Sequence, residues 1–205
     1  MAAMRPPCLA VVLVAVAAPA ARAASDVKAI DAQCAAAAKH KDHARIYGDV
    51  SGAVRPGPSD HDGNWRLFKD ADELKAYEAK QGAPNTEATV WSAPDGTTIA
   101  LMHFTSKASD WGEDVDYCFR PDGTLSRLIS AMVNFEEELY GHRNLYFAPD
   151  GAVVSKKERA SDNGSRRKGP DMMDGFPTTI VYPRVQTLPF TSADGSAALP
   201  KKTPQ

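Results

Sequence analysis

The hydrophobic positions of this chain follow a helical period at first and a strand period afterwards. Beyond residue 24, apolar residues recur at intervals of three and four, as one buried helix face requires: Val27, Ile30, Cys34 and Ala37 or Ala38. Ser25 or Asp26 is a suitable N-cap, alanine filling raises helix propensity, and Gly48 is a stop signal. The pattern predicts an N-terminal helix over residues 24–47.

A second, shorter helix is predicted after a loop and a short strand. Residues 48–63 are dense in Gly, Pro, Ser and Asp, which favours a loop, and residues 64–68 alternate like a short strand. In the segment 70–84, Asp70 and Glu73 have the spacing of a capping box, and a glycine near the end is typical of a helix stop.

From residue 87 onward the period changes to two, which predicts strands. In residues 98–105, Ile99, Leu101 and His103 share one face, and the residues between them share the other. The segments that alternate in this way, or that flank a turn, are residues 88–93, 98–105, 114–120, 143–148 and 152–158. We expect them to pair as an antiparallel sheet.

Pro-Asp-Gly occurs three times, each time after a strand-like segment. The copies are Pro94, Asp95 and Gly96; Pro121, Asp122 and Gly123; and Pro149, Asp150 and Gly151. In a four-residue type I turn, Pro suits the second position because its φ is already about −65°, and Gly at the fourth tolerates the left-handed conformation. The recurrence therefore predicts a hairpin repeat in a meandering sheet rather than a ligand loop.

Residues 124–141 fit two structures. A strand would carry on one face Leu125, Ile129, Val133 and Phe135. A helix capped by Thr124 and stopped by Gly141 would instead carry on one face Leu125, Leu128, Ile129, Met132, Val133 and Leu139. The other two Pro-Asp-Gly turns lead into strand-like segments, so internal analogy favours a strand as far as Asn134.

The C-terminal part is predicted to be less regular. Residues 159–175 are polar and basic, which favours an exposed loop, and residues 176–190 are apolar but broken by prolines, which favours an edge strand and extended wrapping. Residues 191–205 are predicted to be a disordered tail. The whole pattern predicts an α+β protein: an N-terminal helix and a second short helix packed on a meandering antiparallel sheet of about six strands, with the domain over residues 48–190.

The first 23 residues have the order of a secretory signal peptide. Arg5 lies in a short basic head, an apolar run extends from Leu9 to Ala18, and small residues follow Pro19. The apolar run is shorter than the roughly 20 residues that a bilayer crossing needs. We therefore expect cleavage near Ala23, a periplasmic or secreted protein, and no membrane span in the mature chain.

The charge balance argues against nucleic-acid binding. Cleavage after Ala23 would remove Arg5 and Arg22 and leave 22 basic against 26 acidic residues, a formal net charge of −4. Nucleic-acid binding proteins normally carry a clear basic excess. The expected partner is an envelope or extracellular protein or a small ligand, of unknown identity.

Cleavage would also leave Cys34 and Cys118 as the only two cysteines. In an oxidising compartment an isolated pair usually forms a disulfide, although two unpaired buried cysteines are the alternative. We predict a bridge that pins the first helix to the strand entering the second Pro-Asp-Gly turn. On that strand, Cys118 lies on the same face as the polar Asp116, whereas Tyr117 and Phe119 lie on the other face.

Candidate chemistry gathers around His103. The chain has no H-E-x-x-H, G-x-S-x-G, P-loop, dinucleotide or Cys-x-x-Cys motif. The segment 110–116 carries four carboxylates, Asp110, Glu113, Asp114 and Asp116, one strand after His103. If the two strands pair as a hairpin, His103 and Asp114 or Asp116 meet and could act as general acid and base. A charged hairpin connection that serves solubility is the competing interpretation.

The remaining charged groups are interpreted as solvated surface. His40 and His43 have the spacing of a shared metal site, but a helix end is the simpler explanation, so no metal is expected. Asp60, Asp62 and Asn64 look like part of a calcium loop, yet the glycine comes too early and the bidentate glutamate is missing. The acidic run Glu136–Glu138 and the interrupted basic stretch from Lys156 to Lys168 are likewise assigned to solubility.

The stretch YCFRPDGTLSRL, residues 117–128, locally resembles the tyrosine- and glycine-containing hairpin repeats of bacterial surface and antitoxin-type repeat proteins. The resemblance implies hairpin geometry alone, so no functional residue follows from it. The sequence therefore predicts a non-catalytic binding or interaction module of the cell envelope without a cofactor. The alternative is a secreted hydrolase that uses His103, Asp114 and Asp116.

Overall fold

The structure, a computed structural model, describes residues 18–52, 64–162, 168–169, 173, 176 and 178–191. Its elements in chain order are α1 (Ala18–Ala37), η1 (Ala38–His43), β1 (Arg45–Asp49), β2 (Trp65–Phe68), α2 (Ala71–Gln81), β3 (Thr86–Ser92), β4 (Thr98–Thr105), β5 (Trp111–Phe119), β6 (Leu125–Asn134), β7 (Leu139–Phe147), β8 (Val153–Asp162), β9 (Lys168–Gly169) and η3 (Val185–Thr187). Most of the predicted signal peptide, the pair Asp60 and Asp62, and the tail beyond Thr191 lie outside the described residues.

No helix in the described part of the chain is long and apolar enough to cross a membrane.

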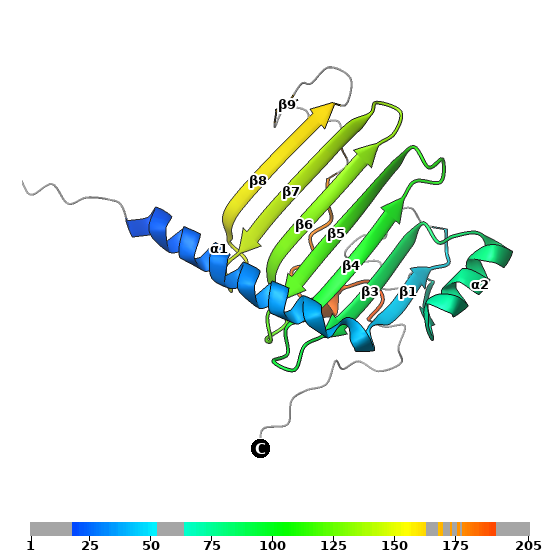
Figure 1. The fold of residues 1–205 in the computed structure, drawn as a ribbon, viewed down its shortest axis with the longest axis horizontal. Helices are drawn as coiled ribbons and strands as arrows, with labels where there is room; N and C mark the ends of the chain where they lie inside the picture. Colours follow the sequence, from blue (N-terminus) through cyan, green and yellow to red (C-terminus); the bar gives the residue numbers. More distant parts are fainter. Residues whose placement is uncertain are drawn as a thin grey trace, which may run out of the picture.

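The described strands form one antiparallel sheet in the order β2-β1-β3-β4-β5-β6-β7-β8-β9 (Figure 1). The predicted meander is present as β3 to β8, each strand pairing with the next. The predicted total of about six strands is wrong, because β1 and β2 extend the sheet on one side and the two-residue β9 extends it on the other. The α+β class is confirmed.

The N-terminal helix begins six residues before the predicted start and ends ten residues before the predicted end. α1 runs from Ala18 to Ala37, so Ser25 and Asp26 lie inside the helix and are not its N-cap. A short 3-10 segment follows, and residues 45–47 of the predicted helix instead form the first part of β1, between β2 and β3. Tyr47 explains this difference, since its ring stacks on Phe190 with centroids 4.5 Å apart. Burial against a residue far along the chain outweighs the local helix preference.

The Pro-Asp-Gly segments are hairpin turns, as predicted. Their glycines have φ of 89° at Gly96, 81° at Gly123 and 88° at Gly151. In the first turn the amide of Gly96 donates to the carbonyl of Ala93, and the Asp95 carboxylate accepts from the amide of Thr97, both at 2.9 Å. The other two turns repeat these bonds. Each motif thus closes its turn with backbone and side-chain hydrogen bonds.

Residues 125–134 form the strand β6, which confirms the strand interpretation of this segment. The pairing of β6 with β5 shifts by one residue, because Phe119 faces Leu125 whereas Cys118 faces Arg127. The predicted alternation assumed an unbroken strand and placed Leu125 on the same face as Ile129. The bulge at Ser126 instead turns Leu125 into the core on the other face.

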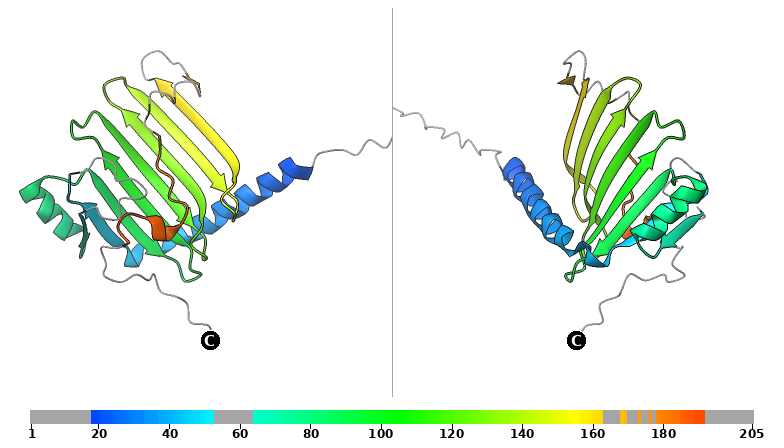
Figure 2. Two further views of the ribbon diagram at one scale, coloured as in Figure 1. Left: turned by 180° about the vertical axis from the view of Figure 1, so that it is seen from behind. Right: turned by 45° about the vertical axis from the view of Figure 1, so that its right-hand side comes forward.

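The sheet is covered on both faces, by different parts of the chain (Figure 2). α1 crosses one face and packs on Trp91, Ile99 and Tyr146. The segment 178–191, which we call the strap, runs over the opposite face and inserts four apolar side chains into the main core: Tyr182, Val185, Leu188 and Phe190. The prediction for this segment is an edge strand with extended wrapping. It wraps over the sheet, and instead of a strand it forms a β-bridge between Arg184 and Thr124.

α2 is confirmed as the second helix and packs at the β2 end of the sheet. The Asp70 carboxylate caps it by accepting from the amide of Glu73 at 2.9 Å. The ring of Tyr77 meets that of Phe68 edge-on, with centroids 5.5 Å apart. Phe68 lies opposite Ile46, on the same side of the sheet as α1. Two helices therefore border this side, and the strap covers the other.

Candidate functional site

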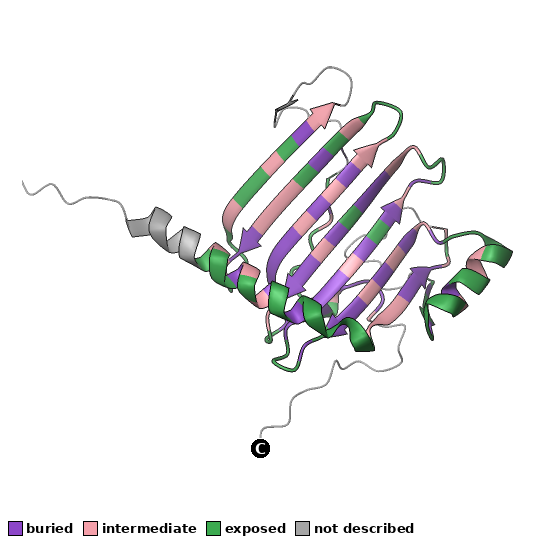
Figure 3. Ribbon diagram, viewed as in Figure 1, coloured by how far each residue is buried: buried purple, intermediate pink, exposed green. Residues whose placement is uncertain are grey.

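The sheet surface between α1 and α2 contains a hollow of about 340 Å³. Its apolar floor consists of Leu101, Ile129 and Ala131, and its polar side chains are Glu87, Thr89, His103, Asp114 and Asp116. We call these eight residues the open face. Figure 3 shows exposed and half-buried positions on the strands above α1, where they are not covered by the helix.

Strand register brings three titratable residues of the open face into one row. Glu87 of β3 faces His103 of β4, and His103 faces Asp114 of β5. The Nδ1 atom of His103 lies 2.7 Å from Oδ1 of Asp114, a hydrogen-bond distance, while the side chains remain 47% and 76% exposed. The two strands are hairpin partners as the sequence suggested, so the histidine and a carboxylate meet on one face.

The other carboxylates of the 110–116 segment do not join this pair. Glu113 points to the opposite face, where it is buried and its carboxylate accepts hydrogen bonds from Ser130 and Thr179 at 2.7 and 2.6 Å. Asp110 lies in the β4–β5 connection and is bonded to Ser106. Glu113 thus anchors the strap to the sheet and has no place in the open face.

Glu87 lies between two titratable groups, Glu78 of α2 and His103 of β4. Partial burial raises the pKa of the Glu87 carboxyl, and the charge and hydrogen bond of Glu78 raise that pKa further, while His103 acts in the opposite direction. A raised pKa in the folded protein means that ionised Glu87 is less stable there than in the unfolded chain.

Replacing Glu87 by glutamine removes its repulsion with Glu78 and is expected to stabilise the protein at pH 7 by about 0.5 kcal/mol. The gain is small because half-exposed carboxylates are screened by water. Because the pKa of Glu87 is raised in the folded protein, protonated Glu87 stabilises the fold. This stabilisation is complete below the ordinary glutamate pKa of about 4.3 and is lost as the pH rises through the raised pKa of the folded protein. Urea unfolding at pH 7 and pH 4 checks this: the gain should vanish at pH 4. The exposed Glu136→Gln is the control, and an equal gain at both pH values would contradict the assignment.

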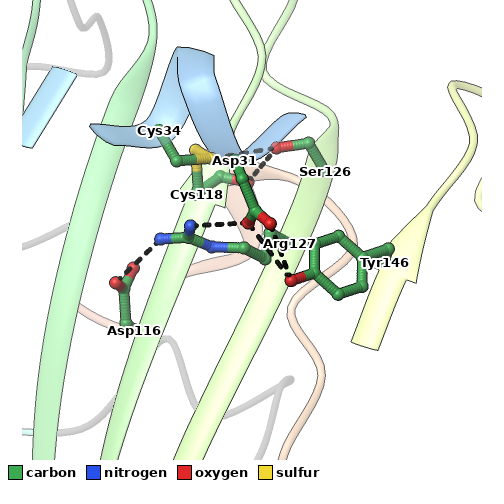
Figure 4. A network of polar contacts seen from close by, with 7 residues as sticks. All are labelled: Asp31, Cys34, Asp116, Cys118, Ser126, Arg127 and Tyr146. Atoms are coloured by element: carbon green, nitrogen blue, oxygen red, sulfur yellow. Dashed lines mark hydrogen bonds and ion pairs between the residues drawn. A yellow bond between two sulfur atoms is a disulfide. The ribbon is translucent and has the colours of Figure 1, made fainter. Parts of the chain in front are cut away.

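Asp116 lies on the α1 side of the open face and belongs to a partly buried polar network (Figure 4). Arg127 of β6 donates to Asp116 and to Asp31 of α1, both at 3.0 Å, and Tyr146 of β7 donates to Asp31 at 3.1 Å. Burial raises the pKa of Asp116, although the charge and hydrogen bond of Arg127 lower it. In the described part of the chain, Oδ1 of Asp116 and Nε of Arg127 have no hydrogen-bond partner.

The predicted disulfide joins Cys34 of α1 to Cys118 of β5 beside this network (Figure 4). Both cysteines are fully buried, and the hydroxyl of Ser126 donates to the carbonyl of Cys118 at 2.8 Å. The indole of Trp91 donates to the carbonyl of Ala37 at 2.9 Å. Cys118 can share a face with polar Asp116 because that face is covered by α1, whereas Tyr117 and Phe119 lie under the strap.

A second hollow, of about 720 Å³, lies at the end of the sheet where α1 stops. The first two Pro-Asp-Gly turns line it together with His40, Asp42 and His43 of η1 and Val185 and Gln186 of the strap. The turns are structural, as predicted, but they also line a surface depression. Among the described residues no group of three His, Cys, Asp or Glu side chains is arranged to hold a metal ion.

Sequence reasoning identified His103, Asp114 and Asp116 but not their neighbours Glu87, Arg127 and Asp31. Asp31 precedes Cys34 by one helical turn, so the predicted disulfide places it near the sheet. Glu87 and Arg127 carry no such signal, because each reaches the site only through strand register.

No protein-family model, curated protein or solved structure matches this chain. The case for a function therefore depends on the open face itself. A histidine whose Nδ1 is held by a carboxylate presents Nε2 as an acceptor or base, and carboxylates beside an apolar floor favour ligands with cationic groups.

Proposed function

We propose that the protein is a non-catalytic binding module of the cell envelope, periplasmic or secreted, that holds its ligand on the open face. The observation that carries this proposal is the hollow of about 340 Å³, with an apolar floor and polar side chains around it. Small-molecule and side-chain binding sites have volumes of about 300–1,000 Å³ and combine an apolar lining with a few orienting polar groups.

The location in the envelope is supported by the disulfide. Cys34 and Cys118 are bonded and fully buried, and such bonds persist in oxidising compartments. The bond also holds α1 beside the open face, so the shape of the site depends on it.

Chemical-shift perturbation with a fragment library tests binding at the open face. We expect the methyl signals of Leu101, Ile129 and Ala131 to shift for the fragments that bind. Ala131→Trp should fill the hollow and weaken binding at least about tenfold, because an indole displaces the ligand from the floor. The matched control is Val153→Trp, at an exposed apolar position of β8. If the shifts cluster elsewhere, or if Ala131→Trp binds normally, the site is wrong.

Hydrolysis is the second candidate function, favoured by the 2.7 Å bond between His103 and Asp114. His103 would draw a proton from water while Asp114 orients the ring. The two functions separate in one comparison: His103→Ala should abolish hydrolysis if the protein is an enzyme, whereas a binding module should show no turnover of ester, amide or glycoside substrates in either form.

A further inference from the structure

We infer that the open face recognises a polypeptide segment whose lysine or arginine side chains enter the hollow with their apolar stems on its floor. This inference rests on the proposed binding function and adds the class of ligand. Three observations on the described residues lead to it: the balance of charge, an acceptor that lacks a donor, and the spacing of the carboxylates.

The charge around the hollow is predominantly negative. Glu87, Asp114 and Asp116 line it, and Glu78 of α2 is hydrogen-bonded to Glu87. Arg127, the cation that binds Asp116, is already shared between Asp116 and Asp31. An anionic ligand would be repelled here, whereas an ammonium or guanidinium group would relieve the repulsion between Glu78 and Glu87.

The hollow also offers acceptors that need donors. Oδ1 of Asp116 is buried without a hydrogen-bond partner among the described residues. When they are ionised, the carboxylates of Glu87 and Asp114 can accept hydrogen bonds but cannot donate them. Lysine and arginine side chains carry several N–H donors and no acceptor. Their methylene stems suit the floor of Leu101, Ile129 and Ala131, since long cationic side chains bury the stem and keep the charge near water.

The spacing of the carboxylates points to a peptide rather than a single amine. Glu87 and Asp114 flank His103 in one row across β3, β4 and β5, so their strands lie about 10 Å apart at the usual spacing between strands. In an extended polyproline II peptide, residues i and i+3 lie on the same side about 9 Å apart. Two cationic side chains at these positions therefore match the two carboxylates.

Titration of the purified protein with acetyl-Gly-Arg-Pro-Pro-Arg-Gly-amide tests this inference, with methyl shifts as the readout. We expect shifts at Leu101, Ile129 and Ala131, and dissociation that rises with salt because the charges are partly exposed. Asp114→Asn and Glu87→Gln should each raise Kd about three- to fivefold, as expected for one exposed ion pair. Glu136→Gln, in the turn between β6 and β7, should leave Kd unchanged.

Four further outcomes would overturn the inference at different levels. If the citrulline analogue of the peptide binds equally well, the positive charge is not recognised. If agmatine binds as tightly as the peptide, the ligand is a small cation and the peptide source is wrong. If neutral or anionic fragments shift the floor methyls and the cationic probes do not, the ligand class fails while the binding function stands; if no compound shifts them, both fail.

Discussion

Replacing Cys34 and Cys118 together by alanine is expected to lower the free energy of unfolding by about 3–5 kcal/mol. The bond closes a loop with a sequence separation of 84 residues, and opening it gives the unfolded chain a large gain in conformational entropy. The double substitution also removes the covalent link between α1 and β5, so the amide hydrogens of α1 should exchange faster than those of β5. Urea unfolding and hydrogen exchange of the double variant measure the two effects.

The reduced protein is the control for this result, and the choice of alanine avoids a separate penalty. The unaltered protein in the presence of a reductant should lose as much stability as the double variant. Alanine avoids placing serine hydroxyls at positions that are fully buried. A loss below about 1 kcal/mol would mean that packing alone holds α1 on the sheet.

Replacing Arg127 by methionine is expected to destabilise the protein by about 2–3 kcal/mol at pH 7, since breaking a buried ion pair leaves a carboxylate without its cation. The Arg127 side chain is 11% exposed, whereas its partners Asp116 and Asp31 are 32% and 45% exposed, which places the expected loss below that of a fully buried pair. Urea unfolding measures it. Arg159→Met, an exposed arginine of β8, is the matched control and should cost much less.

The loss in Arg127→Met should depend on pH. Burial raises the pKa of Asp116 and Arg127 opposes this, so removing Arg127 raises that pKa further. A raised folded-state pKa stabilises the protonated protein, and the deficit should therefore shrink as the pH falls from 7 to 4.5. The double variant Arg127→Met/Asp116→Leu should recover most of the stability, because the more buried of the two carboxylates that Arg127 neutralises is then removed together with it. A deficit that is the same at both pH values would contradict this account.

The turns and both helices could be predicted because their signals are local. Pro and Gly set backbone dihedrals by themselves, so Gly96, Gly123 and Gly151 adopt positive φ where the sequence places them. The cap at Asp70 and the apolar stripe through Cys34 are likewise properties of neighbouring residues.

The parts of the fold that the sequence predicts wrongly depend on contacts between distant residues. β1 was included in the helix because its strand character depends on pairing with β2 and β3 and on the Tyr47–Phe190 stack. The strap could not be placed from sequence, since its core contribution comes from packing on strands of the sheet that lie far earlier in the chain.

The candidate site was foreseen only where two neighbouring strands suffice. His103 and Asp114 are joined by a short connection, so a hairpin brings them together. Glu87, Arg127 and Asp31 come from β3, β6 and α1, and their approach requires the register of several strands and the docking of a helix.

The sequence by itself determined which segments carry the two helices, where the chain turns, which segments of the central meander alternate as strands and which two cysteines remain to pair. These features depend on dihedral preferences and side-chain periods that each segment carries alone. Only the tertiary structure decided that both faces of the sheet are covered, that Ser126 forms a bulge, and that Glu87, His103 and Asp114 share one row. Register and docking are set by packing between distant segments, and a shift of one residue would turn each of these side chains to the other face.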